Sequence, residues 1–103
     1  MSRALIFLAA LAVAGPAHGE VLALRCPMVM IAAESLYEID FTATTVRLTN
    51  LVAPVTMPAA IDERSIAWRN GNAFFRLDRS TNELMQAPSE QGPWELGSSC
   101  VRL

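Results

Sequence analysis

The clearest hydrophobic pattern in the chain runs from Ser65 to Gln86, where apolar and polar residues alternate with the period of a β-strand. Two alternating segments flank Asn70-Gly71-Asn72, and these residue types tolerate positive φ in tight turns. The stretch therefore predicts a β-hairpin. Whichever two residues form the turn, the pairing fixes the two faces: one carries Ile66, Trp68, Phe75 and Leu77, and the other carries Ala67, Arg69, Phe74, Arg76 and Asp78.

Weaker alternation predicts further short strands over 21–26, 37–41, 45–52, 83–86 and 94–96. We expect a turn at Thr42-Ala43-Thr44, and a short loop with Asn82 in the left-handed region before the strand over 83–86. Pro54 and Pro58 bracket residues 55–57, which are expected to form an edge strand or an ordered loop because proline cannot donate to a sheet ladder. Residues 28–36 are expected to be a loop or a short helix.

About seven to eight short strands, with turns roughly every ten residues and no long helical pattern, indicate an all-β fold. The chain is short enough for one small domain over residues 20–103. We expect a small antiparallel up-and-down barrel or a strongly curved sheet, closed by one disulfide.

Residues 1–19 have the pattern of a secretory signal peptide. Arg3 carries a positive charge, Ala4 to Ala14 is an uninterrupted apolar run, and Ala17 and Gly19 are small residues suited to a cleavage site. The alternative, a membrane anchor, needs about 20 apolar residues to cross the bilayer. The arginine before the first cysteine does not fit the lipobox of bacterial lipoproteins. We therefore expect a mature chain, Glu20 to Leu103, that is periplasmic or secreted and has no stable membrane anchor.

The charge of this mature chain narrows the choice of partners. It has seven arginines, no lysine and ten acidic residues, so its net charge is 7 − 10 = −3. That balance argues against nucleic acid and against an anionic membrane surface. Using arginine alone would suit bidentate recognition of carboxylates, although a coding bias towards GC-rich codons explains it more simply.

Cys26 and Cys100 are the only cysteines and lie near the two ends of the mature chain. An even pair in an exported protein indicates a disulfide. Such a bond would close a loop of about 75 residues and stabilise the fold by on the order of 4 kcal/mol.

Few residues of the mature chain suit catalysis. The only histidine, His18, would leave with the signal peptide, lysine is absent, and both cysteines are expected in the disulfide. The usual general bases, nucleophiles, and nitrogen or sulfur metal ligands are then missing. The sequence has no Gly-rich phosphate loop, nucleophile elbow or calcium loop. Asp40 and Asp78 remain as a candidate carboxylate pair, but exposed strand carboxylates are usually just solvated. We expect no enzyme activity, no metal site and no cofactor.

Three aromatic residues are candidates for a binding surface. Trp68 shares a face with Ile66 and Leu77, which favours a place in the core. Trp94 is assigned neither to the core nor to the binding face. Phe74 falls on the other face, beside Arg69 and Arg76, and aromatic residues with arginines are typical of protein interfaces. We therefore take Arg69, Phe74 and Arg76 as the candidate binding face. The alternative is that Phe74 is an isolated exposed aromatic or packs beneath a loop.

Several segments occur in a recognisable order: Cys26, Tyr37 to Val46, Ile66-Ala67-Trp68, Phe75 to Leu84, and Cys100. With this pattern the chain resembles a diffuse group of uncharacterised secreted proteobacterial β-proteins, in which Asn82 would stand at a usual glycine. More distantly it is similar to the small periplasmic barrels that inhibit C-type lysozyme, which are disulfide-stapled and noncatalytic. Their Ser-Gly-x-x-Tyr type motif is absent here, so the resemblance implies the architecture and not the lysozyme target.

Three functions follow as hypotheses. The first is a noncatalytic exported module that binds another envelope protein. In one form of this hypothesis, the bound protein is a cell-envelope hydrolase and the module inhibits it. The second is a carrier of a small apolar ligand, favoured by the flexible side chains of Met28, Met30, Met57 and Met85, although so small a barrel has little interior to spare. The third, and the least favoured, is a hydrolase that uses carboxylates.

Overall fold

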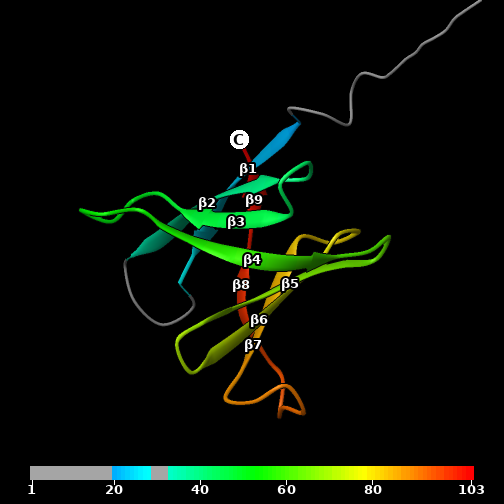
Figure 1. Cartoon of the computed structure of the whole chain (residues 1–103). Coiled ribbons are helices and arrows are strands. Elements are labelled where there is room, and N and C mark those ends of the chain that lie inside the picture. The colour runs from blue at the N-terminus through cyan, green and yellow to red at the C-terminus, as the bar shows by residue number, and fades with distance from the viewer. Residues whose placement is uncertain (1–19, 29–32) are drawn as a thin grey trace, which may run out of the picture.

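Nine β-strands and no helix make up the residues that the structure describes, which are 20–28 and 33–103 of a computed structural model. The strands are β1 (Val21–Pro27), β2 (Glu34–Asp40), β3 (Thr45–Leu48), β4 (Val55–Ile61), β5 (Ser65–Asn70), β6 (Ala73–Asp78), β7 (Glu83–Ala87), β8 (Glu95–Ser99) and β9 (Val101–Arg102). All neighbours are antiparallel, and from β8 back to β1 the order in the sheet follows the chain (Figure 1). The predicted all-β fold is confirmed, whereas the predicted signal peptide lies outside the described residues.

The end of the chain closes this sheet into a nearly complete barrel. β8 pairs with β7, and after Cys100 the chain continues as β9, which pairs with β1. The disulfide between Cys26 and Cys100 crosses the same seam, with 4.2 Å between the two Cα atoms. Ser98 Oγ also donates to the carbonyl of Pro27 there. The up-and-down barrel and its disulfide are therefore as the sequence predicts.

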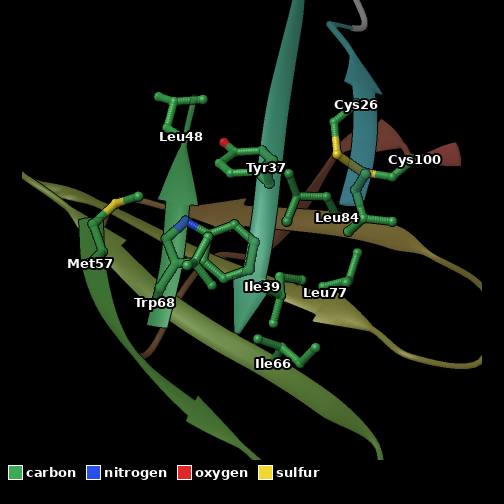
Figure 2. Close-up of a cluster of buried hydrophobic side chains, with 12 residues drawn as sticks. Cys26, Tyr37, Ile39, Leu48, Met57, Ile66, Trp68, Leu77, Leu84 and Cys100 are labelled. Carbon is green, nitrogen blue, oxygen red and sulfur yellow. A yellow bond between two sulfur atoms is a disulfide. The ribbon is translucent and has the colours of Figure 1, made fainter. Parts of the chain in front are cut away.

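The inward faces of the strands form one hydrophobic core, and Figure 2 shows its central part. Trp68 lies against the rings of Tyr37 and Phe75, with centroids 5.2 and 5.6 Å away. The sulfurs of the disulfide belong to the same cluster. Its buried members are Leu24, Cys26, Tyr37, Ile39, Val46, Leu48, Met57, Ile66, Trp68, Leu77, Leu84 and Cys100. Because these side chains alternate along every strand, the pattern that predicts the strands also predicts which residues are buried.

The central hairpin is confirmed in register and in both faces. Asn70 pairs with Ala73, so Gly71 and Asn72 are the two turn residues. Gly71 has a φ of 62° and Asn72 is not among the residues with positive φ, as in a type II′ turn, which favours glycine at the first central position. Asn82 has a φ of 63°, as expected for its loop.

Two predicted boundaries in the first half of the chain are wrong. β2 begins at Glu34, so residues 34–36 are strand and not loop or helix; residues 29–32 lie outside the described part. β3 ends at Leu48, whereas the prediction extends to Val52. The reason is the amide of Asn50, which accepts from the Leu36 N–H (3.2 Å) and donates to the Glu34 carbonyl (2.8 Å). This amide continues the ladder on β2 while the main chain turns away.

The segment around Pro58 is an internal strand, so its prediction as an edge strand or loop is also wrong. β4 pairs with β3 up to Pro58 and with β5 from Ala59 onwards. The Ala59 N–H donates to the Thr44 carbonyl on the β3 side, so the position of the missing N–H at Pro58 faces β5, because successive N–H groups point to opposite sides. Proline is tolerated here because the ladder to β5 begins only at Ala59, so no partner on β5 needs the missing N–H.

At the C-terminus, the predicted strand over 94–96 is shifted. β8 covers Glu95–Ser99, which leaves Trp94 in the preceding loop and brings residues 97–99 into the sheet. Gly97 lies close to the Gln86 side chain: a Cβ there would come within 3.0 Å of Gln86 Oε1. A glycine that allows such close approach is compatible with a strand, so its presence does not end β8.

An up-and-down barrel has its connections at two ends. At one end, on the right of Figure 1, are the three short turns 41–44, 62–64 and 79–82. Each turn is closed by the carboxylate of the aspartate that precedes or opens it: Asp40, Asp62 and Asp78 accept from backbone N–H groups two and three residues later. The opposite end carries the β3–β4 loop, the β5–β6 turn and the β7–β8 loop. These hydrogen bonds make the turns rigid, and we call the end of the barrel that carries them the Asp-closed end.

Candidate functional site

The outer face of the β5–β6 hairpin brings the three predicted site residues together. Arg69 and Phe74 are direct cross-strand partners, and the guanidinium carbon of Arg69 lies over the Phe74 ring, 5.7 Å from its centroid. Arg76 projects from the same face two residues farther along β6. Phe74 is half-buried, whereas both arginines are exposed. Arg69, Phe74 and Arg76 therefore form a continuous surface at the loop end of the barrel.

A fourth residue, Trp94, completes this surface. The guanidinium carbon of Arg76 lies over its ring, 4.3 Å from the centroid. Trp94 is held by a tight turn in the β7–β8 loop, where the Gly92 N–H donates to the Ser89 carbonyl and Ser89 Oγ donates to the Gly92 carbonyl. Gly92 has a φ of 98°, and a Cβ at this position would come within 3.0 Å of the backbone nitrogen of Trp94. Glycine is therefore needed where the loop turns Trp94 towards Arg76.

These residues border an open groove of about 870 Å³, which we call the arginine–aromatic groove. β4 and β5 pair only over Ala59–Ile61. Residues 55–58 of β4 have no partner on β5, so the sheet opens between these two strands towards the end of the barrel that carries the β5–β6 turn. The small residues Ala60 and Ala67 leave room on the outer face. The groove is lined by Pro58, Ala59, Ala60, Ala67, Trp68, Arg69, Gly71, Phe74, Phe75, Arg76, Glu90 and Trp94.

Both arginines keep their hydrogen-bonding capacity. Within the described residues, Arg69 and Arg76 contact aromatic rings but form no ion pair and no side-chain hydrogen bond, and the one ion pair found joins Arg25 to Glu34 at 3.7 Å. A guanidinium that stacks on a ring still presents its N–H groups at its edge, and this fork matches a carboxylate. The groove therefore combines two exposed cations with apolar surface, a combination suited to an acidic and partly apolar partner.

The carboxylates that sequence reasoning considered for catalysis are committed to turns. Asp40 accepts from the N–H groups of Thr42 and Ala43 at 3.0 and 2.9 Å. Asp78 accepts from Ser80 and Thr81, and the hydrogen bonds from Ser80 hold the pKa of its carboxyl below the usual range. A carboxyl with a lowered pKa stays ionised near neutral pH and is a weaker proton acceptor, so it is poorly suited to general acid or base catalysis. Asp40 and Asp78 thus each have a local structural role that requires no contact between them.

The barrel interior is packed with side chains. Met57 belongs to the core, Met28 is exposed and Met85 is half-buried; Met30 lies outside the described residues. The methionines therefore do not share one ligand-lining surface in the described part of the chain. Among residues 20–28 and 33–103, no group of three or more histidine, cysteine or acidic side chains is placed to hold a metal ion. In the same ranges, no helix is long and apolar enough to span a membrane.

Trp94 is the residue of this site that sequence reasoning left unassigned. Its sequence signal is the preceding Gln91-Gly92-Pro93, a turn-forming segment that places an aromatic residue in a loop and not in the core. Comparison of the chain with protein-family models, with curated proteins and with solved structures finds no match.

Proposed function

We propose that this protein is an exported, noncatalytic binding module that docks another envelope protein in the arginine–aromatic groove. The observation that carries the proposal is the pair of arginines, Arg69 and Arg76, each stacked on an aromatic ring with no acidic partner among the described residues. Arginine and large aromatic residues supply most of the binding energy at protein interfaces. Stacking restricts the motion of the guanidinium groups before binding, so less conformational entropy is lost on association.

The partner class that we favour is a hydrolase of cell-envelope polysaccharides. Most glycoside hydrolases carry two catalytic carboxylates on either side of a substrate cleft. A rigid hairpin that presents two cations beside apolar surface is complementary to such a cleft, and its occupation would inhibit the enzyme. Export is supported by the pattern of residues 1–19 and is compatible with the disulfide.

The test is a pull-down from a periplasmic extract with the mature protein, followed by affinity measurement with the captured partner. We expect Arg76→Ala and Arg69→Ala each to weaken binding by about tenfold or more, because a bidentate hydrogen bond to a charged group is lost. Phe74→Ala should weaken binding by about 1 kcal/mol or more. Arg47→Ala is the matched control, since Arg47 is an exposed arginine on the outer face of β3.

Two results would contradict the proposal. Equal loss of affinity in the Arg47 control would mean that only the overall charge matters. Unchanged affinity in both groove variants would mean that the partner binds elsewhere. An enzyme assay on the captured protein then tests inhibition: its rate of glycan cleavage should fall with wild-type protein and fall less with Arg76→Ala.

A further inference from the structure

The β3–β4 loop, residues 49–54, exposes an apolar run that the groove does not include. Leu51, Val52, Ala53 and Pro54 are consecutive and all exposed, with relative exposures of 47% for Leu51 and 108% for Val52. Soluble proteins rarely leave such a run in contact with water unless another molecule covers it. In Figure 1 this loop projects from the barrel at the left, beyond the end of β3.

The base of this loop is firmly attached to the barrel. The Thr49 N–H donates to the Leu36 carbonyl at 2.9 Å, and the amide of Asn50 makes its two hydrogen bonds to the backbone of β2. The tip that follows is therefore held away from the core by residues that are themselves fixed. This attachment at residues 49 and 50 reduces the conformational entropy that the loop loses when its tip enters a pocket.

The loop lies at the same end of the barrel as the arginine–aromatic groove. In a chain of consecutive antiparallel strands, the β3–β4, β5–β6 and β7–β8 connections share one end, and these bear the apolar tip, the hairpin turn next to Arg69, and Trp94. β4 links the two regions, since it begins at the loop and reaches the groove at Pro58. A partner in the groove would thus be adjacent to the tip.

We infer that Leu51 and Val52 insert into an apolar pocket of the partner protein, beside the carboxylates that the groove arginines bind. Only the contact between the groove arginines and the partner's carboxylates rests on the proposed function. A bilayer is the weaker choice of occupant, because membrane-inserting tips carry cationic flanks, whereas here residues 48–61 carry no charged side chain, lysine is absent and the chain has a net charge of −2. A second copy is also disfavoured, because its own arginine–aromatic groove adds the charges of Arg69, Arg76 and Glu90 to the apolar lining, whereas the tip is uncharged.

The experiment places the photoreactive residue benzoylphenylalanine at position 52 of the full chain, expressed in its native host. Position 101 serves as the control, because Val101 is 46% exposed and lies in β9, opposite Arg25 of β1 and on a different part of the sheet from β3 and β4. Irradiation of intact cells should give one protein adduct at position 52 that is absent at position 101, and mass spectrometry should map it to an apolar pocket of a single identified protein. No adduct, an adduct with a second copy of the chain, or an adduct to a charged surface would overturn the inference.

Three further measurements separate the loop from the groove. Val52→Ser should weaken binding to the identified protein by about tenfold, while Val101→Ser leaves it unchanged; equal effects would overturn the inference. Sedimentation with vesicles of phosphatidylethanolamine and phosphatidylglycerol should show no binding, and binding that Val52→Ser abolishes would assign the tip to a bilayer instead. If the adduct persists undiminished with Arg69→Ala and Arg76→Ala, the loop contact stands and the groove proposal fails. If those variants lose the partner but position 52 gives no adduct, the groove proposal stands and the loop inference fails.

Discussion

Trp68 and Phe74 lie on opposite faces of one hairpin, so truncating each side chain should have very different consequences. Trp68 is only 5% exposed and contacts the rings of Tyr37 and Phe75. Phe74 is half-buried on the outer face, with Arg69 above it. Trp68→Ala should therefore destabilise the fold, whereas Phe74→Ala should mainly affect binding.

The expected magnitudes follow from burial. Replacing a buried tryptophan by alanine costs about 3 to 5 kcal/mol, and the two ring contacts favour the upper half of that range. Full burial of a phenylalanine contributes about 1.5 to 3 kcal/mol. Half-burial of Phe74, with about 0.5 kcal/mol from an exposed cation–π contact, therefore predicts a loss near 1 to 2 kcal/mol. The two variants should differ by at least about 2 kcal/mol, or roughly 8 to 16 °C in Tm for a domain of this size.

Urea and thermal unfolding, followed by tryptophan fluorescence or circular dichroism, measure this difference. Trp68→Phe is the informative control. It preserves an aromatic ring and removes the indole Nε1–H, which is buried without a hydrogen-bond partner in the described residues, and an unsatisfied buried donor is itself costly. We expect Trp68→Phe to cost well under half as much as Trp68→Ala. If Phe74→Ala unfolds the domain as readily as Trp68→Ala does, then Phe74 belongs to the core and the proposed binding face does not exist.

Three other predictions concern stability. Replacing both disulfide cysteines with alanine should lower the free energy of unfolding by about 4 kcal/mol, because the bond spans 74 positions; two free thiols in native protein, detected by alkylation and mass measurement, would contradict the disulfide itself. Gly71→Val should cost about 1 to 2 kcal/mol in thermal unfolding because of the positive φ, although a side chain there meets no neighbour; Asn72→Val should cost less, and an unmoved Tm for Gly71→Val would mean that the turn is misplaced. Hydrogen bonds, chiefly from Ser65 and Ser80, lower the pKa values of Asp62 and Asp78, so their stabilisation is present above the ordinary pKa of 3.8 and is lost as pH falls through the folded-state values. Asp62→Asn with Asp78→Asn should therefore reduce the loss of Tm between about pH 4 and pH 2, and an unchanged acid profile would show that the turn carboxylates do not govern acid stability.

Strand existence follows from local alternation, but strand ends depend on contacts that alternation does not contain. The hairpin at Gly71 is predictable because turn residues and both flanking patterns agree. The end of β3 depends on the Asn50 amide reaching β2, 14 to 16 positions away. Pro58 is accommodated only because β4 changes partner there. Neither the contact of Asn50 with β2 nor the change of partner strand at Pro58 can be recognised from the neighbouring residues in the sequence.

The candidate site was partly predictable for a similar reason. Arg69, Phe74 and Arg76 share a face through hairpin register alone, which is a local property. The contact between Arg76 and Trp94 depends on how the β7–β8 loop folds back over β6. The apolar run at Leu51 and Val52 has the composition of a strand, and only its position beyond Asn50 shows that it is exposed. Sequence pattern identifies apolar residues here, but it does not identify the surface that they leave uncovered.

The barrel seam is made by residues from the two extremes of the folded chain. β1 and Cys26 begin the sheet, whereas Cys100 and β9 complete it, and the Leu103 N–H donates to the Ala23 carbonyl at 3.0 Å. A nascent polypeptide that emerges from its N-terminus can form each hairpin in turn, but its first strand has no second neighbour until β9 has been synthesised. Closure thus depends on the last strand: a chain that stops at Ser99 would keep its strand order up to β8, yet it would lack both the covalent and the hydrogen-bonded link to β1, and proteases would meet an open edge.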